Sequence, residues 1–157
     1  MSGKSYDLGL LLSNSIFLSA AASLAAAQAI KVVINLLKSG GRQDAREAFL
    51  TFLWRTGGMP SSHSATAVSI CASIAFQEGF SNLFILSLFF CLIVIRDALG
   101  VRRSSGLQAQ ALNRLGNDLE CRYGIKYDPV REIHGHSWSE VAAGSLLGLI
   151  LAFLFSR

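Results

Sequence analysis

The stretch LFILSLFFCLIVI, residues 83–95, contains no charged residue and only one serine. With its flanks it runs from about Leu83 to Val101. This is close to the roughly 20 mostly apolar residues that a helix needs to cross about 30 Å of hydrocarbon. Arg96 and Asp97 interrupt the apolar run only near its end. The stretch therefore predicts a helix that spans a membrane.

Three other apolar segments approach the same length, at Ser15 to Leu37, Pro60 to Phe76 and Ser137 to Phe155. The serines and alanines of the second segment suit close contact between helices. Further pieces at Glu47 to Trp54 and Gly106 to Leu119 predict short amphipathic or surface helices. Four spans with short or amphipathic connections indicate an all-α protein, an integral membrane helical bundle.

The composition also favours a membrane location. Hydrophobic residues make up 52% of the 157-residue chain and charged residues only 15%, whereas a typical soluble domain has about 25% charged residues. The length allows one domain, so we expect residues 1–157 to form a single membrane-embedded unit. The net charge of +4 comes from basic residues beside apolar runs, a pattern that favours anionic lipids over nucleic acid.

The lysines and arginines predict the orientation of the chain. If all four segments span, the side that holds both termini receives only Lys4 and Arg157. The opposite side receives Lys38, Arg42, Arg46, Arg55, Arg102, Arg103, Arg114, Arg122, Lys126 and Arg131. The positive-inside rule places this second side in the cytoplasm. We therefore expect a multi-pass protein of a bacterial-type inner membrane.

The histidines lie on this same cationic side, at His63, His134 and His136. His63 belongs to GGMPSSHS, residues 57–64, where Pro60 suits the first turn of a helix and a serine can cap it. The free amides of the helix start, together with the hydroxyls of Ser61 and Ser62, predict an anion site that His63 would face as an acid. The alternative is a serine-capped helix start with an interfacial histidine.

A second group of polar residues begins the last apolar segment. His136 and Glu140 are four residues apart, so the carboxylate can reach one imidazole nitrogen if the helix includes both. That contact would set the tautomer and leave the other nitrogen free as a nucleophile or base. The alternative is a capping box, in which Ser137 and Glu140 satisfy the backbone. A cap at Ser137 would place His136 just outside the helix.

Cations complete the predicted site. Lys31 lies inside an apolar run, where a charge is costly, so we expect it to have a functional partner. Lys38 and the Arg102–Arg103 pair suit phosphate oxygens, although membrane anchoring and compensation of helix dipoles are alternatives. Asp97 could pair with Lys31 or with one of the two arginines.

Together these residues resemble the type 2 phosphatidic acid phosphatase (PAP2) superfamily, which includes the vanadium haloperoxidases. Its signature has three parts, K-x6-R-P, P-S-G-H and S-R-x5-H-x3-D. Lys31-x6-Lys38 is similar to the first part, Pro60-Ser61-Ser62-His63 to the second, and His136-x3-Glu140 to the third. The chain looks closest to the divergent branch, whose small members share GGMPSSHSA and D-x-x-G-V-R-R; residues 57–65 and 97–103 fit these stretches.

The chain departs from that signature at several positions. Lys38 stands where the family has arginine, with Arg42 as an alternative, and Glu140 replaces aspartate. No arginine lies six residues before His136, where Val130 stands, so Arg102 or Arg103 would take that role. Conventional members have six spans and a site that faces away from the cytoplasm, whereas the charge count here points to the cytoplasmic face.

The resemblance implies a single PAP2-like phosphatase domain over residues 1–157 that hydrolyses a lipid phosphate without metal or other cofactor. His136, oriented by Glu140, would attack phosphorus and form a phosphohistidine, while His63 protonates the leaving oxygen and then activates water. The remaining implied residues are the phosphate-binding Lys31, Lys38, Ser61, Ser62, Arg102 and Arg103 and the supporting Gly58 and Asp97. The substrate would be phosphatidate, phosphatidylglycerophosphate or an isoprenyl diphosphate.

Two other functions compete with hydrolysis. Departures from the signature favour a non-catalytic lipid-binding or scaffold protein, and the intramembrane Lys31 and Asp97 favour a small transporter or channel component. Faces rich in serine and alanine would permit a homodimer.

Overall fold

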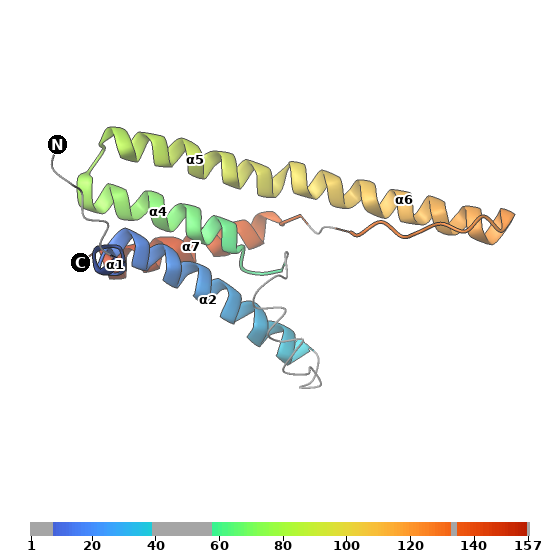
Figure 1. The fold of residues 1–157 in the computed structure, drawn as a ribbon, viewed down its shortest axis with the longest axis horizontal. Helices are drawn as coiled ribbons and strands as arrows, with labels where there is room; N and C mark the ends of the chain where they lie inside the picture. Colours follow the sequence, from blue (N-terminus) through green and yellow to red (C-terminus); the bar gives the residue numbers. More distant parts are fainter. Residues whose placement is uncertain (1–7, 39–57, 133–134, 157) are drawn as a thin grey trace.

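The computed structural model describes residues 8–38, 58–132 and 135–156. Within these ranges the chain forms helices joined by turns and loops, without a strand (Figure 1). The helices are α1 (Leu8–Leu12), α2 (Ser15–Lys38), α4 (Ser62–Glu78), α5 (Asn82–Leu99), α6 (Val101–Tyr123) and α7 (Trp138–Phe155). The all-α prediction is confirmed. Arg42, the predicted piece Glu47 to Trp54, and His134 lie outside the described residues.

Among the described residues, three helical stretches are long and apolar enough to cross a membrane: Ser15–Lys38, Asn82–Tyr123 and Trp138–Phe155. Large apolar side chains cover their outer faces. On α5, Leu86, Phe89 and Ile93 are 67%, 61% and 66% exposed. Such a face would be unfavourable in water, whereas lipid covers it in a bilayer. The chain is therefore an integral membrane protein.

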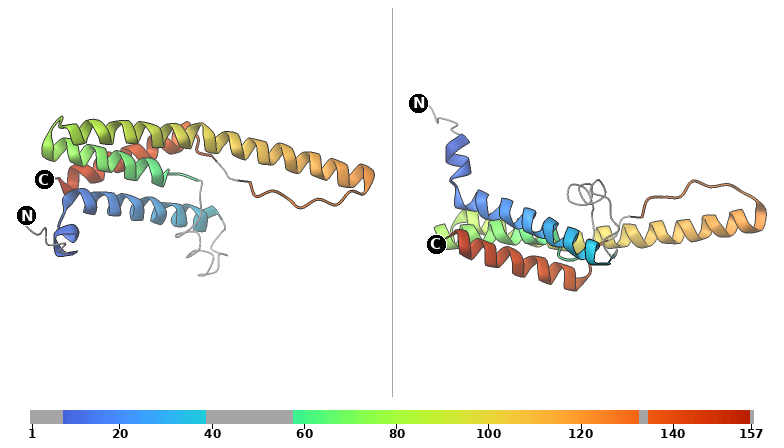
Figure 2. Two further views of the ribbon diagram at one scale, coloured as in Figure 1. Left: turned by 45° about the horizontal axis from the view of Figure 1, so that its top comes forward. Right: turned by 90° about the horizontal axis from the view of Figure 1, so that it is seen from below.

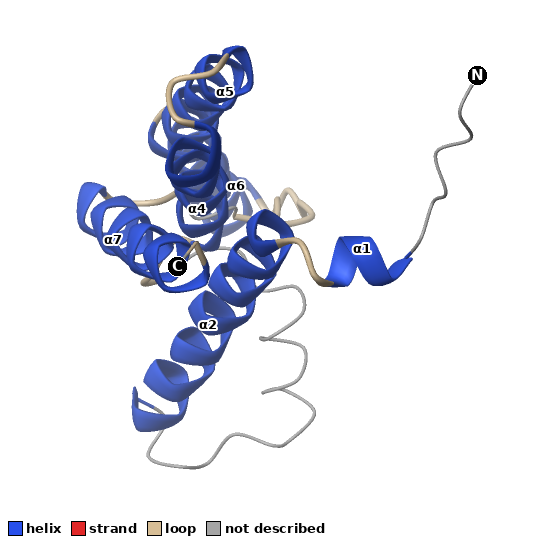
Figure 3. Cartoon of the chain, turned by 90° about the vertical axis from the view of Figure 1, so that its left-hand side faces the viewer, coloured by secondary structure: helices blue, strands red, loops and turns tan. Residues whose placement is uncertain are grey.

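α4 is the fourth predicted span and differs from the other three. It has 17 residues, or about 25 Å at 1.5 Å per residue, and it is rich in serine and alanine. It packs against α2, α5 and α7 (Figure 3), and Ser64, Ala65 and Ser69 on it are fully buried. The predicted count of four spans is thus approximate, because α4 is a short, tightly packed helix whose small side chains let its neighbours approach.

α4 and α7 begin at the same end of the bundle and run parallel (Figure 2). Two glycines one turn apart on α7, Gly144 and Gly148, lie against the backbone carbonyls of Ser61 and Ala65. A Cβ atom at either glycine would collide with the facing carbonyl oxygen. This small-residue spacing lets the two backbones touch, so it holds the start of α7 beside the start of α4.

α2 runs antiparallel to α4 and contacts it through polar side chains. The Oγ atoms of Ser19 and Ser73 are 2.7 Å apart, and Gln77 Nε2 donates to Ser15 Oγ at 2.6 Å. Hydroxyl and amide groups that bond across a helix interface are satisfied away from water. The same register, continued three turns along α2, brings Lys31 level with the start of α4.

α6 continues the direction of α5 beyond the ends of the other helices (Figures 1 and 2). Only Gly100 separates the two helices, and α6 ends at Tyr123. The predicted surface helix Gly106 to Leu119 is therefore too short at both ends, and the third predicted span ends two residues too late. The reason is that residues 101–123 lack proline and contain many good helix formers, so polarity alone does not end the helix.

Residues 124–132 return along α6. Asn113 Nδ2 donates to the Val130 carbonyl and to Glu132 Oε1, both at 2.9 Å, and Asn113 Oδ1 accepts from Val130 N at 2.8 Å. The ring of Tyr127 packs directly against Gly116. We call residues 101–132, α6 with its returning segment, the arm.

Candidate active site

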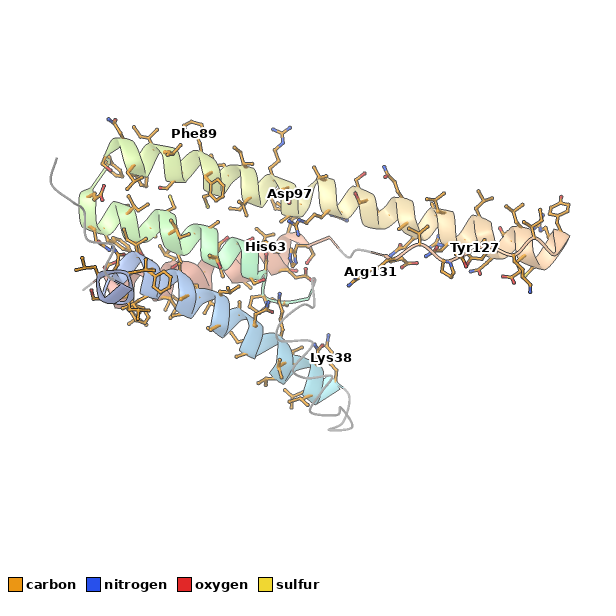
Figure 4. All side chains as sticks on the ribbon, viewed as in Figure 1. Lys38, His63, Phe89, Asp97, Tyr127 and Arg131 are labelled. Carbon is orange, nitrogen blue, oxygen red and sulfur yellow. The ribbon has the colours of Figure 1, made fainter. Side chains whose placement is uncertain are left out.

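Three helix ends meet at one end of the bundle, where α5 ends and α4 and α7 begin, and α2 reaches them at Lys31 before it diverges. His63 and Asp97 both lie in this region (Figure 4). The starts of α4 and α7 each carry unpaired amides and the positive end of a helix dipole. Two such ends side by side favour an anion.

The start of α4 is a serine-capped turn. The Ser61 hydroxyl oxygen accepts from Ser64 N at 3.3 Å and from the Ser64 hydroxyl at 3.0 Å. Ser61 N donates to the Glu140 carbonyl at 2.9 Å, and Ser61 is fully buried. Two residues before Pro60, Gly58 has a φ of 84°, a left-handed conformation that favours glycine. Ser61 therefore joins the starts of α4 and α7 as well as capping its own helix.

The start of α7 combines the two arrangements that the sequence left open. The Ser137 hydroxyl accepts from Glu140 N at 3.4 Å, and Glu140 Oε2 accepts from Ser137 N at 3.2 Å, which makes a capping box. The same Oε2 atom lies 2.9 Å from His136 Nδ1. His136 stands just before the helix, and its side chain still reaches Glu140 because a carboxylate oxygen can accept more than one hydrogen bond.

The two histidines face each other across the α4–α7 contact. The ring centroids of His63 and His136 are 6.2 Å apart, with the planes inclined at 58°. His136 is 3% exposed, and its Nδ1 is engaged by Glu140. His63 Nδ1 is buried without a hydrogen-bond partner among the described residues.

Lys31 reaches the site from α2. Its Nζ donates to Ser62 Oγ at 3.3 Å, and the lysine is only 4% exposed. The structure therefore gives Lys31 a polar partner, Ser62 at the start of α4, and its functional role stays a prediction.

The structure resolves which group Asp97 contacts. Arg102 Nε donates to Asp97 Oδ2 at 2.6 Å, so the carboxylate pairs with this arginine and not with Lys31. Ala98, next to Asp97, accepts a hydrogen bond from His136 N. Arg102 is thus the member of the arginine pair that has a polar contact beside the histidines.

The other predicted residues occupy less central positions. Arg103 is exposed on the first turn of α6, and its backbone packs against Gly135. Lys38 is exposed at the last residue of α2, where that helix diverges from α4 (Figure 4). No group of three or more His, Cys, Asp or Glu residues in the described ranges could hold a metal ion.

One part of the site was not predicted from the sequence. His136 N donates to the Ala98 carbonyl at 3.2 Å, and Gly135 lies so close to the Arg103 backbone that a Cβ there would collide with it. Gly135, directly before the histidine, was the available signal. The end of α5 and the start of α6 therefore hold the backbone of His136.

Comparisons with known proteins identify the family of the chain. The family model described as "Divergent PAP2 family" matches residues 12–151, so the chain belongs to the divergent PAP2 family. It is also 34% identical over 158 residues to the "Uncharacterized membrane protein YuiD" of Bacillus subtilis (strain 168), with 93% of this chain and 96% of that protein covered. No solved structure matches the chain.

Proposed function

We propose that this end of the bundle is the active site of a lipid-phosphate phosphatase that works through a phosphohistidine on His136. The observation that carries the proposal is the contact of Glu140 with His136 Nδ1 at 2.9 Å, beside the imidazole of His63. A carboxylate on Nδ1 keeps the proton there and leaves the Nε2 lone pair free to attack. A second imidazole nearby can move the proton that the reaction needs.

The reaction would proceed in two steps. In the first, His136 Nε2 forms a bond to phosphorus while the bond from phosphorus to the lipid oxygen breaks, and His63, which enters this step as the doubly protonated imidazolium, gives that oxygen a proton and becomes neutral. In the second, His63 takes a proton from water as the water oxygen attacks phosphorus, and the phosphorus–nitrogen bond breaks. Inorganic phosphate leaves, and both histidines return to their starting states.

The charge that develops on the phosphoryl oxygens would be stabilised by fixed donors. Lys31 and Arg102 supply cations, Ser62 a hydroxyl, and the starts of α4 and α7 supply dipoles. We propose that Ser61 contributes by fixing the start of α4. Lys38 and Arg103 would attract the anionic headgroup from the surface.

The substrate would be a lipid because the site lies at the end of a bundle whose outer face is apolar. We propose phosphatidate, phosphatidylglycerophosphate or an isoprenyl diphosphate, which would reach the site by diffusion in the bilayer. The excess of lysine and arginine on this side favours a cytoplasmic site. Labelling of a cysteine or tag added at either terminus in intact cells tests the orientation, since both termini should then be accessible from outside.

The direct test is phosphate release by the purified protein in detergent from these three lipids, without added metal. Wild type should cleave at least one of them, and His136→Ala should lose activity on the order of 10³-fold or more, as expected for a nucleophile. Glu120→Gln, at an exposed position on α6, serves as a control and should match wild type. Full activity of His136→Ala, or no cleavage of any lipid in the panel, would refute the mechanism.

A second function, a non-catalytic lipid-binding protein, is favoured by one observation. His136 and Lys31 are only 3% and 4% exposed, which leaves little surface for a substrate. Rapid quenching of the protein with a ³²P-labelled lipid phosphate separates the two functions. A phosphatase should retain label on His136, whereas a binding protein should retain the intact lipid and no covalent phosphate.

A further inference from the structure

The joint between α5 and α6, residues 97–103, contains a charged pair, and the mechanism proposed above uses only its arginine. Asp97 and Arg102 lie on opposite sides of Gly100, and Arg102 Nε donates to Asp97 Oδ2 at 2.6 Å. The side chains are 39% and 38% exposed. Since the carboxylate contacts Nε, the two terminal amino groups of the guanidinium keep their donors for another acceptor.

We propose that Asp97 is a positioning residue that acts through Arg102. It holds the guanidinium so that the terminal amino groups face a phosphate bound beside His63 and His136. This inference rests on the proposed function and extends it to a residue that does not itself bind the substrate. Ala98, next to Asp97, accepts a hydrogen bond from His136 N, so the pair lies near the proposed nucleophile.

The physical reason for such a partner is the freedom of the arginine side chain. A guanidinium binds phosphate best through two parallel hydrogen bonds, which require a defined plane. A side chain near the surface, as Arg102 is, would otherwise occupy many rotamers. A carboxylate on Nε removes most of them before the substrate arrives, and a group held in the reactive geometry contributes more to the rate.

The joint also holds the backbone of the histidine. Ala98, next to Asp97, accepts the hydrogen bond from His136 N at 3.2 Å, and Arg103, next to Arg102, packs against Gly135. The cation and the nucleophile are therefore fixed to the same short piece of backbone. This shared support explains how an arginine 34 positions before His136 takes the place of one six positions before it.

A double-mutant cycle tests the proposal. The variants are Asp97→Ala, Arg102→Ala and the double variant, measured for kcat/KM on the cleaved lipid phosphate and for affinity for inorganic phosphate. Each single variant should weaken both quantities by about 10- to 100-fold, the range typical for a charge-assisted contact. The double variant should be no weaker than Arg102→Ala, because Asp97 acts only through that arginine. If the loss in the double variant equals the product of the losses in the two single variants, the proposal is wrong.

Conservative variants and a control guard against a general loss of structure. Asp97→Glu should recover part of the phosphate affinity, and Asp97→Asn, which keeps an acceptor, should lose less than Asp97→Ala. Asp118→Ala, at an exposed position on α6, should match wild type. Recovery by neither Asp97→Glu nor Asp97→Asn would assign Asp97 a purely structural role.

Failure of the proposed function gives a different result from failure of this inference. If wild type cleaves no lipid but binds inorganic phosphate, the same cycle on phosphate affinity decides whether Asp97 acts through Arg102. If wild type neither cleaves a lipid phosphate nor binds inorganic phosphate, both proposals are wrong. If wild type cleaves a lipid phosphate and the effects of the Asp97 and Arg102 substitutions are additive in free energy, only the positioning role of Asp97 is wrong.

Discussion

α4 and α7 each begin with a serine cap that has a histidine close to it in the sequence. The surroundings of the two histidines nevertheless differ. His136 lies before its helix, is almost fully buried and has Nδ1 bound to Glu140. His63 lies inside its helix, and its buried Nδ1 has no partner within the described residues. A fixed imidazole suits attack on phosphorus, whereas an imidazole without a carboxylate partner suits proton exchange. The different positions of the two histidines relative to their helix starts therefore favour unequal chemical roles.

The largest expected effect separates these two roles. With a lipid phosphate, both His63→Ala and His136→Ala should lose activity, by about 10²-fold or more for a removed acid–base group. With an aryl phosphate, whose leaving group needs little protonation, His63→Ala should still form the phosphoenzyme and hydrolyse it slowly. Rapid-quench labelling measures this accumulation, and His136→Ala should give no label. Equal labelling of the two variants would contradict the assignment.

The next comparison separates the two roles of Glu140, its contact with His136 Nδ1 and its part in the capping box of α7. Glu140→Gln removes the charge that supports His136 and should lower kcat by about 10²-fold or more, the usual scale for an acid–base contribution. Ser137→Ala removes the cap and should lower stability by about 1 kcal/mol with little change in kcat. Thermal unfolding in detergent and steady-state kinetics on both variants check this. A similar kcat for the two variants would mean that Glu140 acts only as a cap.

Activity should also depend on the contact between Gly144 and the Ser61 carbonyl, which holds the starts of α4 and α7 together. Gly144→Val places a side chain where α7 touches the Ser61 carbonyl, so it should separate the starts and lower kcat by about 10-fold or more, as small misplacements do. Leu146→Val, at a position 59% exposed on the outer face of the same helix, is the matched control. Wild-type kinetics for Gly144→Val would show that this contact does not set the spacing of the histidines.

The smallest expected effect on kcat comes from a substitution in the arm, far from the two histidines. Asn113→Ala removes three hydrogen bonds that hold the returning segment of the arm to α6, and this segment leads to His136. We expect loss of stability of about 0.5–1.5 kcal/mol, the net contribution of a typical hydrogen bond, because these contacts are exposed or half-buried, and a severalfold lower kcat. Hydrogen exchange of residues 124–132 should increase, and Gln108→Ala, an exposed amide on α6, should leave it unchanged.

Much of the local structure could be predicted from the sequence because it depends on neighbouring residues. The apolar runs predicted the three spanning stretches, and the serines before His63 and Glu140 predicted the starts of α4 and α7. The spacing of four residues predicted the contact between His136 and Glu140. The length of α6 was wrong, because a polar composition indicates exposure and does not by itself end a helix.

The sequence by itself determined an all-α membrane chain of the divergent PAP2 family with its histidines on one side. Only the tertiary structure decided that Asp97 contacts Arg102, that Lys31 contacts Ser62, and that the end of α5 holds His136. The physical reason is distance along the chain. Spacing within a helix sets which side chains share a face, whereas contacts between helices depend on how closely their backbones approach, here at Gly144, Gly148 and Gly135.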